Sequence, residues 1–464
     1  MFKKIEVWIL YLVILVSIIL IVGFGVLVRQ ELVGNTNLGK YDISFLSKPA
    51  ATIAGLPEKV LKALVKPNPN RVNDPWDEYR DFYSQSGFKG MPNSYESYLL
   101  LSRYDGDNME GIVELVDLTN FETLHTWNPD IDAFNNLIEQ VDEFKYLKRD
   151  DHNKRKTLKH PKLTKDGGLL FGWNSPLRKI DSCSKLIFQN THDIFHHSIE
   201  TDSEGNIWAP SHMYPQSLPK GKVGRNIVSE GGYFDDAIVK LSPEGEVLFE
   251  KSVSQIFIDN GLEYLLFSVG DLTFTKNPIH LNDIQPVDSD SQYWKKGDVF
   301  LSLRHQSMVL LYRPTTNEII WKGVGPFFSQ HDVDIIDNNI ISIFNNNAKN
   351  FDGGRFVDGN NRVILYDFKS NEYSDYLSQS LIEHDVRTPK EGLSEILQNN
   401  DLFIEDSFFA RTLYFNADGT LRWSHVNKAN NGNVYRLGWS RILHTKEDIN
   451  IVNNFINSKV SCNE

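Results

Sequence analysis

The sequence predicts an all-β fold, a six-bladed β-propeller, preceded by a single N-terminal transmembrane helix. Near the N-terminus lies one long uncharged apolar run. From about residue 95 onward, short β-branched and aromatic runs alternate with Gly, Asn and Asp turns, as in proteins built from many short strands. These runs recur as six similar copies. A hydrophobic content of 41%, with 12% aromatic residues, is ample for a folded core and argues against disorder.

The N-terminal apolar run extends from Val7 to Val28; Lys3 and Lys4 precede it and Arg29 ends it. As a helix it would span ~33 Å at ~1.5 Å per residue, enough to cross a bilayer. A cleaved signal peptide has a shorter apolar stretch and a small-x-small cleavage site, which this run fits poorly. We therefore predict an uncleaved anchor with the lysines on the cytoplasmic side. The rest of the chain would lie in an extracytoplasmic, oxidising compartment, the periplasm in a bacterium.

Three parts are predicted along the chain. Residues 1–30 form the transmembrane anchor, residues 31–94 a stalk and lead-in segment broken by several prolines, and residues 95–464 the catalytic propeller. The two cysteines, Cys183 and Cys462, either form a disulfide that ties the tail to the body or remain two free buried thiols.

Each of the six copies consists of an alternating strand, a tight polar or glycine turn, and a second strand that often ends in an aromatic residue. Two further short strands precede each pair, so that four strands recur about every 50 to 70 residues, the sequence signature of a propeller. A β-sandwich, the alternative all-β fold, would not explain a recurring unit of this length. The copies begin at Gly111, Pro176, Ala237, Met308, Arg362 and Arg411.

Charge and motif content exclude several classes of function. A net charge of −13 argues against a nucleic-acid partner, because a phosphate backbone needs a basic face. The chain has no Cys-x-x-Cys motif and no His-Glu-x-x-His motif, so we expect no metal and no cofactor. It also has no nucleophile elbow and no glycine-rich phosphate loop.

Histidine precedes an aliphatic residue in three segments, residues 196–199, 280–284 and 330–333. In a propeller the first strand of each blade lines the central channel, so equivalent positions in successive copies point toward one centre. Side chains alternate along a strand, which places residues two positions before the aliphatic residue on one face. His280 shares this face. The aligned residues include His197, Asn282, His331 and Glu391.

Other side chains complete the candidate site. Arg304 ends a predicted strand, where its guanidinium could fork onto an oxyanion or form an ordinary surface ion pair. We assign substrate binding to His196, Tyr214 and Glu391. Tyr214 is a loop aromatic that could stack on a phenyl ring, with a core or surface role as the alternative. Imidazole itself can act as a nucleophile, an acid or base, or a metal ligand.

Several segments together resemble the arylsulfate sulfotransferase family. In order they are His280-Leu-Asn282-Asp-Ile, Gly297-Asp-Val-Phe-Leu-Ser-Leu-Arg304, Ile320-Trp321, Gln330-His331-Asp332, Glu391 to Asn400, Ala410-Arg411 and Gly419 to Trp423. The resemblance covers roughly residues 95 to 430. It implies a six-bladed propeller that moves a sulfuryl group from an aryl sulfate to a phenol, without a nucleotide sulfate donor.

The resemblance also implies a role for each aligned residue. His331 would be the nucleophile that becomes transiently sulfated, and one histidine would exchange a proton with the phenol. Fixed donors around the charged oxygens would act like an oxyanion hole, where one donor is typically worth ~3 kcal/mol. A covalent intermediate predicts ping-pong kinetics. The residues that would hold the sulfuryl oxygens are His280, Asn282, Arg304 and His197.

Two other functions stay open at this point. One is hydrolysis of sulfate or phosphate esters at the same site, which needs no phenol. The other is a non-catalytic, membrane-tethered propeller that binds a ligand. The partners expected for the transferase are an aryl sulfate donor, a phenolic acceptor and the membrane that holds the helix. The sequence makes no prediction about oligomeric state.

Overall fold

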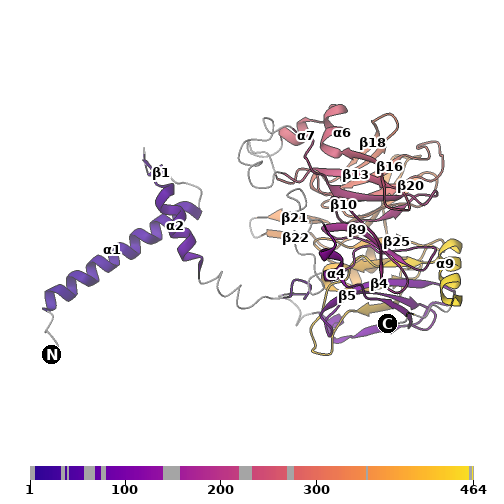
Figure 1. The fold of residues 1–464 in the computed structure, drawn as a ribbon, viewed down its shortest axis with the longest axis horizontal. Coiled ribbons are helices and arrows are strands. Elements are labelled where there is room, and N and C mark those ends of the chain that lie inside the picture. The colour runs from indigo at the N-terminus through magenta and orange to yellow at the C-terminus, as the bar shows by residue number, and fades with distance from the viewer. Residues whose placement is uncertain are drawn as a thin grey trace. The chain divides into compact units, whose positions relative to one another are not determined.

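The chain divides into two units, residues 1–68 and 69–464. Figure 1 shows the computed structural model of the chain. The structure describes residues 6–32, 37–38, 41–56, 68–74, 80–138, 157–218, 233–268, 276–351, 354–458 and 462.

An apolar helix, α1 (Val7–Leu32), makes up most of the described part of the first unit. Its 26 residues span roughly 39 Å and include the whole apolar run that the sequence predicts to be helical. None of its residues is buried. Two short strands, β1 (Asn37–Leu38) and β2 (Tyr41–Asp42), and the helix α2 (Ser44–Ala54) follow it. The length and composition of α1 suit a membrane anchor or a signal sequence.

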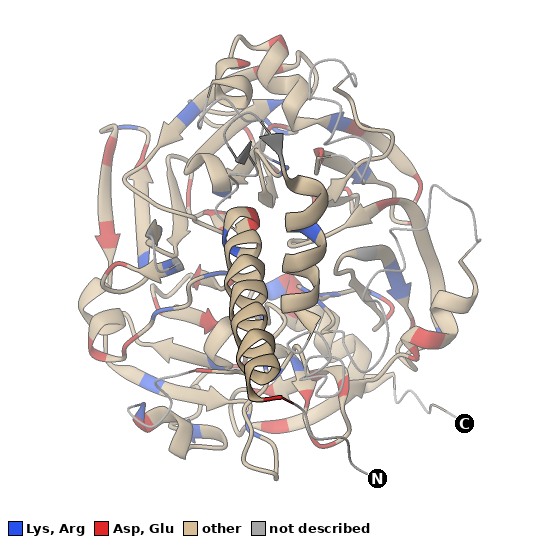
Figure 2. Ribbon diagram, turned by 90° about the vertical axis from the view of Figure 1, so that its left-hand side faces the viewer, with Lys and Arg blue, Asp and Glu red and all other residues tan. Residues whose placement is uncertain are grey.

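The second unit is built from sheets whose described strand pairs are all antiparallel. Four sheets have four or five strands and one has eight, and a small two-stranded hairpin is inserted between two strands of one sheet. Viewed face-on, the sheets surround a common centre, and basic and acidic residues are interspersed around the ring (Figure 2). The all-β, propeller-like class predicted from the sequence is confirmed.

The strands follow the predicted copies closely. The sheet that joins the two ends of the unit consists of β29 (Arg441–Leu443), β4 (Tyr98–Asp105), β5 (Glu110–Asp117) and β6 (Glu122–Trp127). The eight-stranded sheet consists of β7 (Lys162–Leu163), β8 (Leu169–Phe171), β9 (Ser175–Ile180), β10 (Leu186–Phe195), β11 (Glu200–Thr201), β12 (Ile207–His212), β13 (Asp236–Leu241) and β14 (Val247–Ser252).

Three further sheets complete the ring. The first contains β15 (Leu281–Pro286), β16 (Val299–Leu303), β17 (Met308–Arg313) and β18 (Glu318–Val324). The second contains β19 (Val333–Ile335), β20 (Ile340–Asn345), β23 (Arg362–Asp367) and β24 (Glu372–Tyr376), with the hairpin β21 (Ala348–Phe351) and β22 (Gly354–Val357) inserted. The third contains β25 (Leu393–Ile396), β26 (Leu402–Asp406), β27 (Arg411–Phe415), β28 (Leu421–Val426) and β3 (Gly87–Gly90).

Short helices connect or cap the strands of the second unit. Most lie in loops between sheets, whereas α9 begins with a capping box in which Thr445 and Asp448 satisfy each other's backbone N–H groups. The α-helices are α4 (Ile131–Asn136), α6 (Val253–Asp259), α7 (Tyr264–Phe267), α8 (Ser378–Glu383) and α9 (Lys446–Asn457), and the 3-10 turns are Asp81–Ser84, Arg304–Gln306 and Ser407–Phe409.

Two sheets combine strands from opposite ends of the unit. β29 pairs with β4, with Arg441 opposite Leu100, and β3 pairs with β28, with Gly90 opposite Trp423. Gly90 has a φ of +122°, and a Cβ atom there would lie 2.7 Å from the Cα of Trp423, so this pairing requires glycine. Backbone pairing between the two ends therefore closes the ring.

Apolar clusters fill the spaces between neighbouring sheets. One cluster joins the β15–β18 sheet to the next sheet through Phe300 and Ile343, and another joins the β25–β28 sheet to the β4–β6 sheet through Trp423 and Leu99. Two more lie on either side of the eight-stranded sheet, and one lies between the β19–β24 and β25–β28 sheets. A sixth lies inside the eight-stranded sheet, between its β8–β9 and β12–β13 parts. The core is thus a continuous ring of apolar packing.

Side-chain carboxylates link the first strands of successive sheets. Asp283 accepts a hydrogen bond from the Val333 N–H at 3.1 Å, and Asp332 accepts one from the Ser394 N–H at 3.0 Å. Both carboxylates are buried, so these bonds fix the spacing of β15, β19 and β25 around the centre.

A disulfide joins Cys183, in the turn between β9 and β10, to Cys462 near the C-terminus. Their Cα atoms are 5.3 Å apart and the residues are 279 positions apart in sequence. Of the two alternatives that the sequence leaves open for the cysteines, the structure has the disulfide.

Replacing both cysteines by serine is expected to lower the free energy of unfolding by about 2 to 5 kcal/mol, because a cross-link over a long loop restricts the unfolded chain. Urea unfolding of the double variant and of the wild type, both without reductant, measures the difference. Reduced wild-type protein serves as the control and should unfold at the urea concentration of the variant. Identical midpoints for the oxidised wild type and the variant would contradict the expectation.

Candidate active site

One residue with a left-handed backbone lies shortly before each of the strands β7, β11, β15, β19, β25 and β29. A non-glycine residue in this region costs ~1–3 kcal/mol and persists only where the surrounding structure imposes it. Its recurrence marks these turns as equivalent positions around the centre. With φ values between 43° and 64°, the six residues are His160, His197, His280, Ser329, Glu391 and Trp439.

Three predicted histidines meet at these turns. The ring centroid of His197 lies 5.2 Å from that of His280 and 6.1 Å from that of His331. Two indole rings complete the cluster, since Trp173 and Trp439 lie 5.3 and 5.9 Å from His197. We call these five residues the central cluster. The structure therefore brings together the three imidazoles that the repeat alignment places at one centre.

His331 is held in a single orientation and tautomer. Its Nδ1 lies 2.6 Å from Oδ1 of Asn346 and 3.1 Å from the carbonyl oxygen of Ser329. Both neighbours are acceptors, so Nδ1 carries the hydrogen and donates it. The other nitrogen, Nε2, accepts a hydrogen bond from the Glu391 backbone N–H at 2.9 Å. Burial lowers the pKa of the His331 imidazole to about 4, so the ring is neutral at pH 7.

Arg304 is a buried cation with unused donors. Its side chain is only 6% exposed, and its Nη1 lies 3.4 Å from Nε2 of His280. Its Nε and Nη2 are buried and make no hydrogen bond to the described residues. The alternative of a surface ion pair is therefore wrong. A buried guanidinium with free donors beside the cluster is suited to bind an anion.

His280 and Asn282 flank the start of β15. The His280 imidazole stacks on His305 at a centroid distance of 4.5 Å, and its Nδ1 lies 2.7 Å from Nδ2 of Asn277. Asn282 is fully buried and its Nδ2 donates to the carbonyl oxygen of Gln330 at 2.8 Å. One amide hydrogen of Asn282 is thus committed to the backbone just before His331.

Glu391 contacts the cluster through its backbone, whereas its carboxylate faces a lysine. Nζ of Lys159 lies 3.0 Å from the Glu391 carboxylate and about equally far, 4.7 and 4.8 Å, from the ring centroids of Trp173 and Trp439. Burial alone would raise the pKa of Glu391, but Lys159, Arg436 and Lys390 lower it to about 2. The carboxylate therefore stays ionised and paired.

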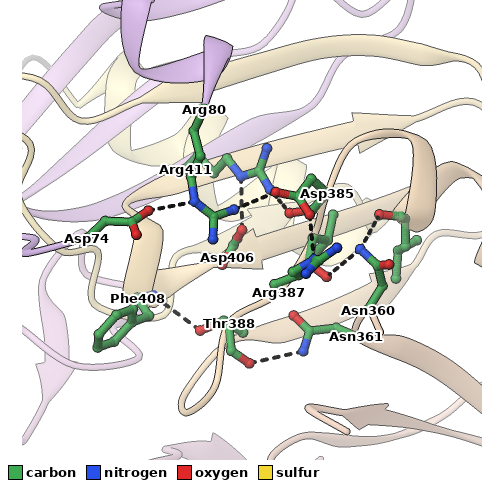
Figure 3. A network of polar contacts seen from close by, with 12 residues as sticks. Asp74, Arg80, Asn360, Asn361, Asp385, Arg387, Thr388, Asp406, Phe408 and Arg411 are labelled. Atoms are coloured by element: carbon green, nitrogen blue, oxygen red, sulfur yellow. Dashed lines mark hydrogen bonds and ion pairs between the residues drawn. The ribbon is translucent and has the colours of Figure 1, made fainter. Parts of the chain in front are cut away.

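A polar network holds the segment that carries the Glu391 N–H (Figure 3). Asp385 pairs with Arg80 and Arg387, each at 2.5 Å, and its carbonyl oxygen accepts a hydrogen bond from Arg411. Further along, Thr388 accepts a hydrogen bond from the Phe408 N–H. Since Arg80 lies ahead of β3, the start of the second unit helps to position this segment.

The remaining two predicted residues lie outside the central cluster. His196 is buried directly behind it, with its Nδ1 2.7 Å from Nδ1 of His197. Tyr214 is 49% exposed on the loop after β12, and no described side-chain interaction joins it to the cluster. The structure does not bring Tyr214 to the histidines.

Sequence reasoning missed Lys159 and Trp439. Lys159 lies three residues before β7 and Trp439 two residues before β29, and both strands are equivalent to those that follow the three histidines. Neither position carries a histidine, so the histidine alignment gives no signal for them. Trp439 is fully buried, and its indole N–H makes no hydrogen bond to the described residues.

A family model for arylsulfotransferase (ASST) matches residues 160–428, more than half of the chain. This chain belongs to the arylsulfotransferase family. The matched range contains most of the arylsulfotransferase site described above, including His197, His280, Arg304 and His331. Lys159 and Trp439 lie just outside it.

The solved structures with a similar fold are distant from this chain in sequence. A protein of unknown function from Bacteroides caccae is 11% identical, with a TM-score of 0.43 and coverage of 71% of this chain and 94% of that one. The WD40 β-propeller domain of Doa1 is 9% identical, with a TM-score of 0.38 and coverage of 78% and 99%. Virginiamycin B lyase from Staphylococcus aureus is 8% identical, with a TM-score of 0.33 and coverage of 59% and 71%. No curated protein matches the chain.

Proposed function

We propose that the protein transfers a sulfuryl group from an aryl sulfate to a phenolic acceptor through a sulfohistidine at His331. The observation that carries the proposal is the pairing of two features in one buried site. His331 is a neutral, oriented imidazole, and Arg304 is a guanidinium whose Nε and Nη2 have no partner among the described residues. The first suits a nucleophile and the second suits a sulfuryl group with its charged oxygens.

The first half-reaction forms a nitrogen–sulfur bond. The lone pair on Nε2 of His331 attacks the sulfur of the aryl sulfate, the bond from sulfur to the aryl oxygen breaks, and the aryl oxygen keeps the electron pair of that bond and leaves as a phenolate. Attack replaces the hydrogen bond from the Glu391 N–H, which Nε2 accepts in this structure. Nδ1 keeps its hydrogen and donates it to Oδ1 of Asn346. The sulfated ring is therefore cationic and remains a good leaving group.

The second half-reaction reverses these roles. The oxygen of an acceptor phenol attacks the sulfur, the nitrogen–sulfur bond breaks, and the phenol proton passes to a base. His197 lies between the other two histidines of the cluster, where it can donate a hydrogen bond to the sulfuryl oxygens. His280 and Asn282 supply further polar contacts near the sulfuryl oxygens.

We also propose that the propeller has six blades, with the eight-stranded sheet divided between β10 and β11. The apolar cluster inside that sheet and the six left-handed turns both support the count. We also propose that α1 is an uncleaved anchor and that the propeller is extracytoplasmic, in the periplasm of a bacterium. The disulfide supports an oxidising compartment.

Initial-rate kinetics test the proposed transfer. With para-nitrophenyl sulfate as donor and a second phenol as acceptor, double-reciprocal plots at several acceptor concentrations should be parallel, as in a ping-pong mechanism. Release of para-nitrophenol should depend on the acceptor after the first turnover. Steady release at an equal rate without acceptor would instead identify an ester hydrolase.

The lowered pKa of His331 predicts the pH below which the sulfation rate falls. A histidine at its usual pKa of ~6.5 would lose its lone pair below that pH. His331, with a pKa of about 4, stays neutral down to about pH 4, so its sulfation rate should be flat from pH 7 to pH 5 and fall tenfold per pH unit only below pH ~4. Rapid-quench labelling at each pH, with circular dichroism as a check on folding, measures this. A midpoint near pH 6.5 would contradict it.

A further inference from the structure

We propose that His196, His212 and Asp236 form a site for one divalent transition-metal ion directly behind the central cluster. The sequence predicts no metal, because the three residues form no motif along the chain. The fold brings them together from the end of β10, the end of β12 and the start of β13.

The strand pairing places the three side chains side by side. His212 lies opposite Asp236 in the β12–β13 pair, and β10 pairs with the other edge of β12. Nε2 of His196 and Nε2 of His212 lie 3.3 and 3.4 Å from the same carboxylate oxygen, Oδ1 of Asp236. The three atoms all lie within 4.8 Å of one another, a separation that one ion could bridge with little movement.

Two of the three donor atoms have nothing else to bind. Nε2 of His196 and Oδ1 of Asp236 are buried and face each other at 3.3 Å, and neither makes a hydrogen bond of good geometry to the described residues. A cation would satisfy both at once. The His212 side chain is 17% exposed, which gives an ion a route from solvent and leaves room for water in a further coordination position. Two imidazoles and one carboxylate suit zinc, cobalt, iron or manganese rather than calcium.

A second group of possible ligands, His192, Asp193 and Glu250, makes a useful comparison. There His192 is exposed and its Nε2 is already hydrogen-bonded to Glu250 at 3.0 Å. Asp193 accepts a hydrogen bond from the Ser211 hydroxyl at 2.5 Å. Oδ1 of Asp193 and Oε1 of Glu250 also lack a partner among the described residues, but the one imidazole of this group is exposed and already hydrogen-bonded, so we assign the ion to the buried group with two imidazoles.

The proposed ion would connect to two residues of the central cluster. Oδ2 of Asp236 accepts the His280 backbone N–H at 2.9 Å, and Nδ1 of His196 lies 2.7 Å from Nδ1 of His197. When Nε2 of His196 binds a metal, its hydrogen lies on Nδ1 and is donated to His197, which then carries its own hydrogen on Nε2. That orientation of His197 as a donor toward substrate rests on the proposed function, whereas the ion itself does not.

Metal titration of the full chain in detergent tests the site. After dialysis against a chelator, Co²⁺ is added and visible absorption bands are followed, and Zn²⁺ is then added as a competitor. Elemental analysis after gel filtration gives the stoichiometry. We expect about one Zn²⁺ per chain, and a loss of affinity of at least about tenfold in His212→Gln and Asp236→Asn. His192→Gln and His384→Gln serve as histidine controls and should bind as the wild type does.

Two results would overturn the site: less than about a tenth of an equivalent of Zn²⁺ or Co²⁺ in the wild type, or a loss of binding in His192→Gln with none in His212→Gln. Misfolding of a variant is distinguished by thermal unfolding of the metal-free proteins. Metal-free His212→Gln should unfold at the temperature of metal-free wild type, and only the wild type should gain stability on adding Zn²⁺. None of these readouts depends on sulfotransferase activity, so the proposed function can fail while the metal site stands.

Discussion

His331→Gln is expected to abolish covalent labelling and to slow turnover by roughly 10⁴-fold or more, the usual scale for removing an enzymatic nucleophile. Wild-type protein incubated with para-nitrophenyl sulfate and no acceptor should gain the mass of one SO₃ group, located on His331 by peptide mass spectrometry. Glutamine preserves much of the volume of histidine and its capacity to hydrogen-bond to Asn346, so the fold should survive.

The control for this variant is His384→Gln, a half-buried histidine away from the cluster, which should label as the wild type does. Labelling of His197 or His280 in the wild type would show that one of these histidines, and not His331, is the nucleophile. The sulfohistidine mechanism would be contradicted if several aryl sulfates add no mass to the wild type and the His331→Gln variant still turns over.

Arg304→Met is expected to lower kcat by about 10²- to 10³-fold, the range found for losing one donor of an oxyanion hole. Unlike most core substitutions it should leave the melting temperature unchanged or raised. The reason is that Nε and Nη2 of Arg304 have no partner, so the variant removes a desolvated cation without leaving another charge unpaired. Steady-state kinetics and thermal unfolding measure the two effects.

Arg313→Met gives the opposite pattern and serves as the matched control. Arg313 forms a two-pronged ion pair with the buried Asp298, at 2.7 Å for both contacts, on the β15–β18 sheet that also carries Arg304. Its loss leaves a buried carboxylate unpaired and should lower the melting temperature while kcat stays near that of the wild type. If Arg304→Met instead loses as much stability as Arg313→Met with kcat unchanged, Arg304 is structural.

The histidines were predictable because they depend on two local rules. Side-chain alternation along a strand and the recurrence of one unit place His197, His280 and His331 at equivalent positions, and the structure has them together. The position of Trp439 depends instead on the pairing of β29 with β4. This is a contact between distant parts of the chain that no local pattern reveals. Sequence reasoning therefore found the middle of the site and missed its ends.

Glu391 shows a further limit of the sequence prediction. Strand alternation points its side chain at the centre, but in the structure its N–H donates to His331 and its carboxylate pairs with Lys159. The sequence also left the role of Arg304 open, because it does not distinguish an arginine in an exposed ion pair from a buried arginine that donates hydrogen bonds to an anion. Burial and the partners of each donor decide between them, and both depend on tertiary packing.

The closure of the ring has a consequence for how the protein is made. β4, β5 and β6 leave the ribosome early, but their sheet lacks its first strand until β29, near the C-terminus, has been synthesised. Edge strands left open for so long can pair with other chains. Synthesis of this protein should therefore demand chaperone protection until the last few dozen residues emerge, and truncation from the C-terminus should cause aggregation rather than a gradual loss of stability.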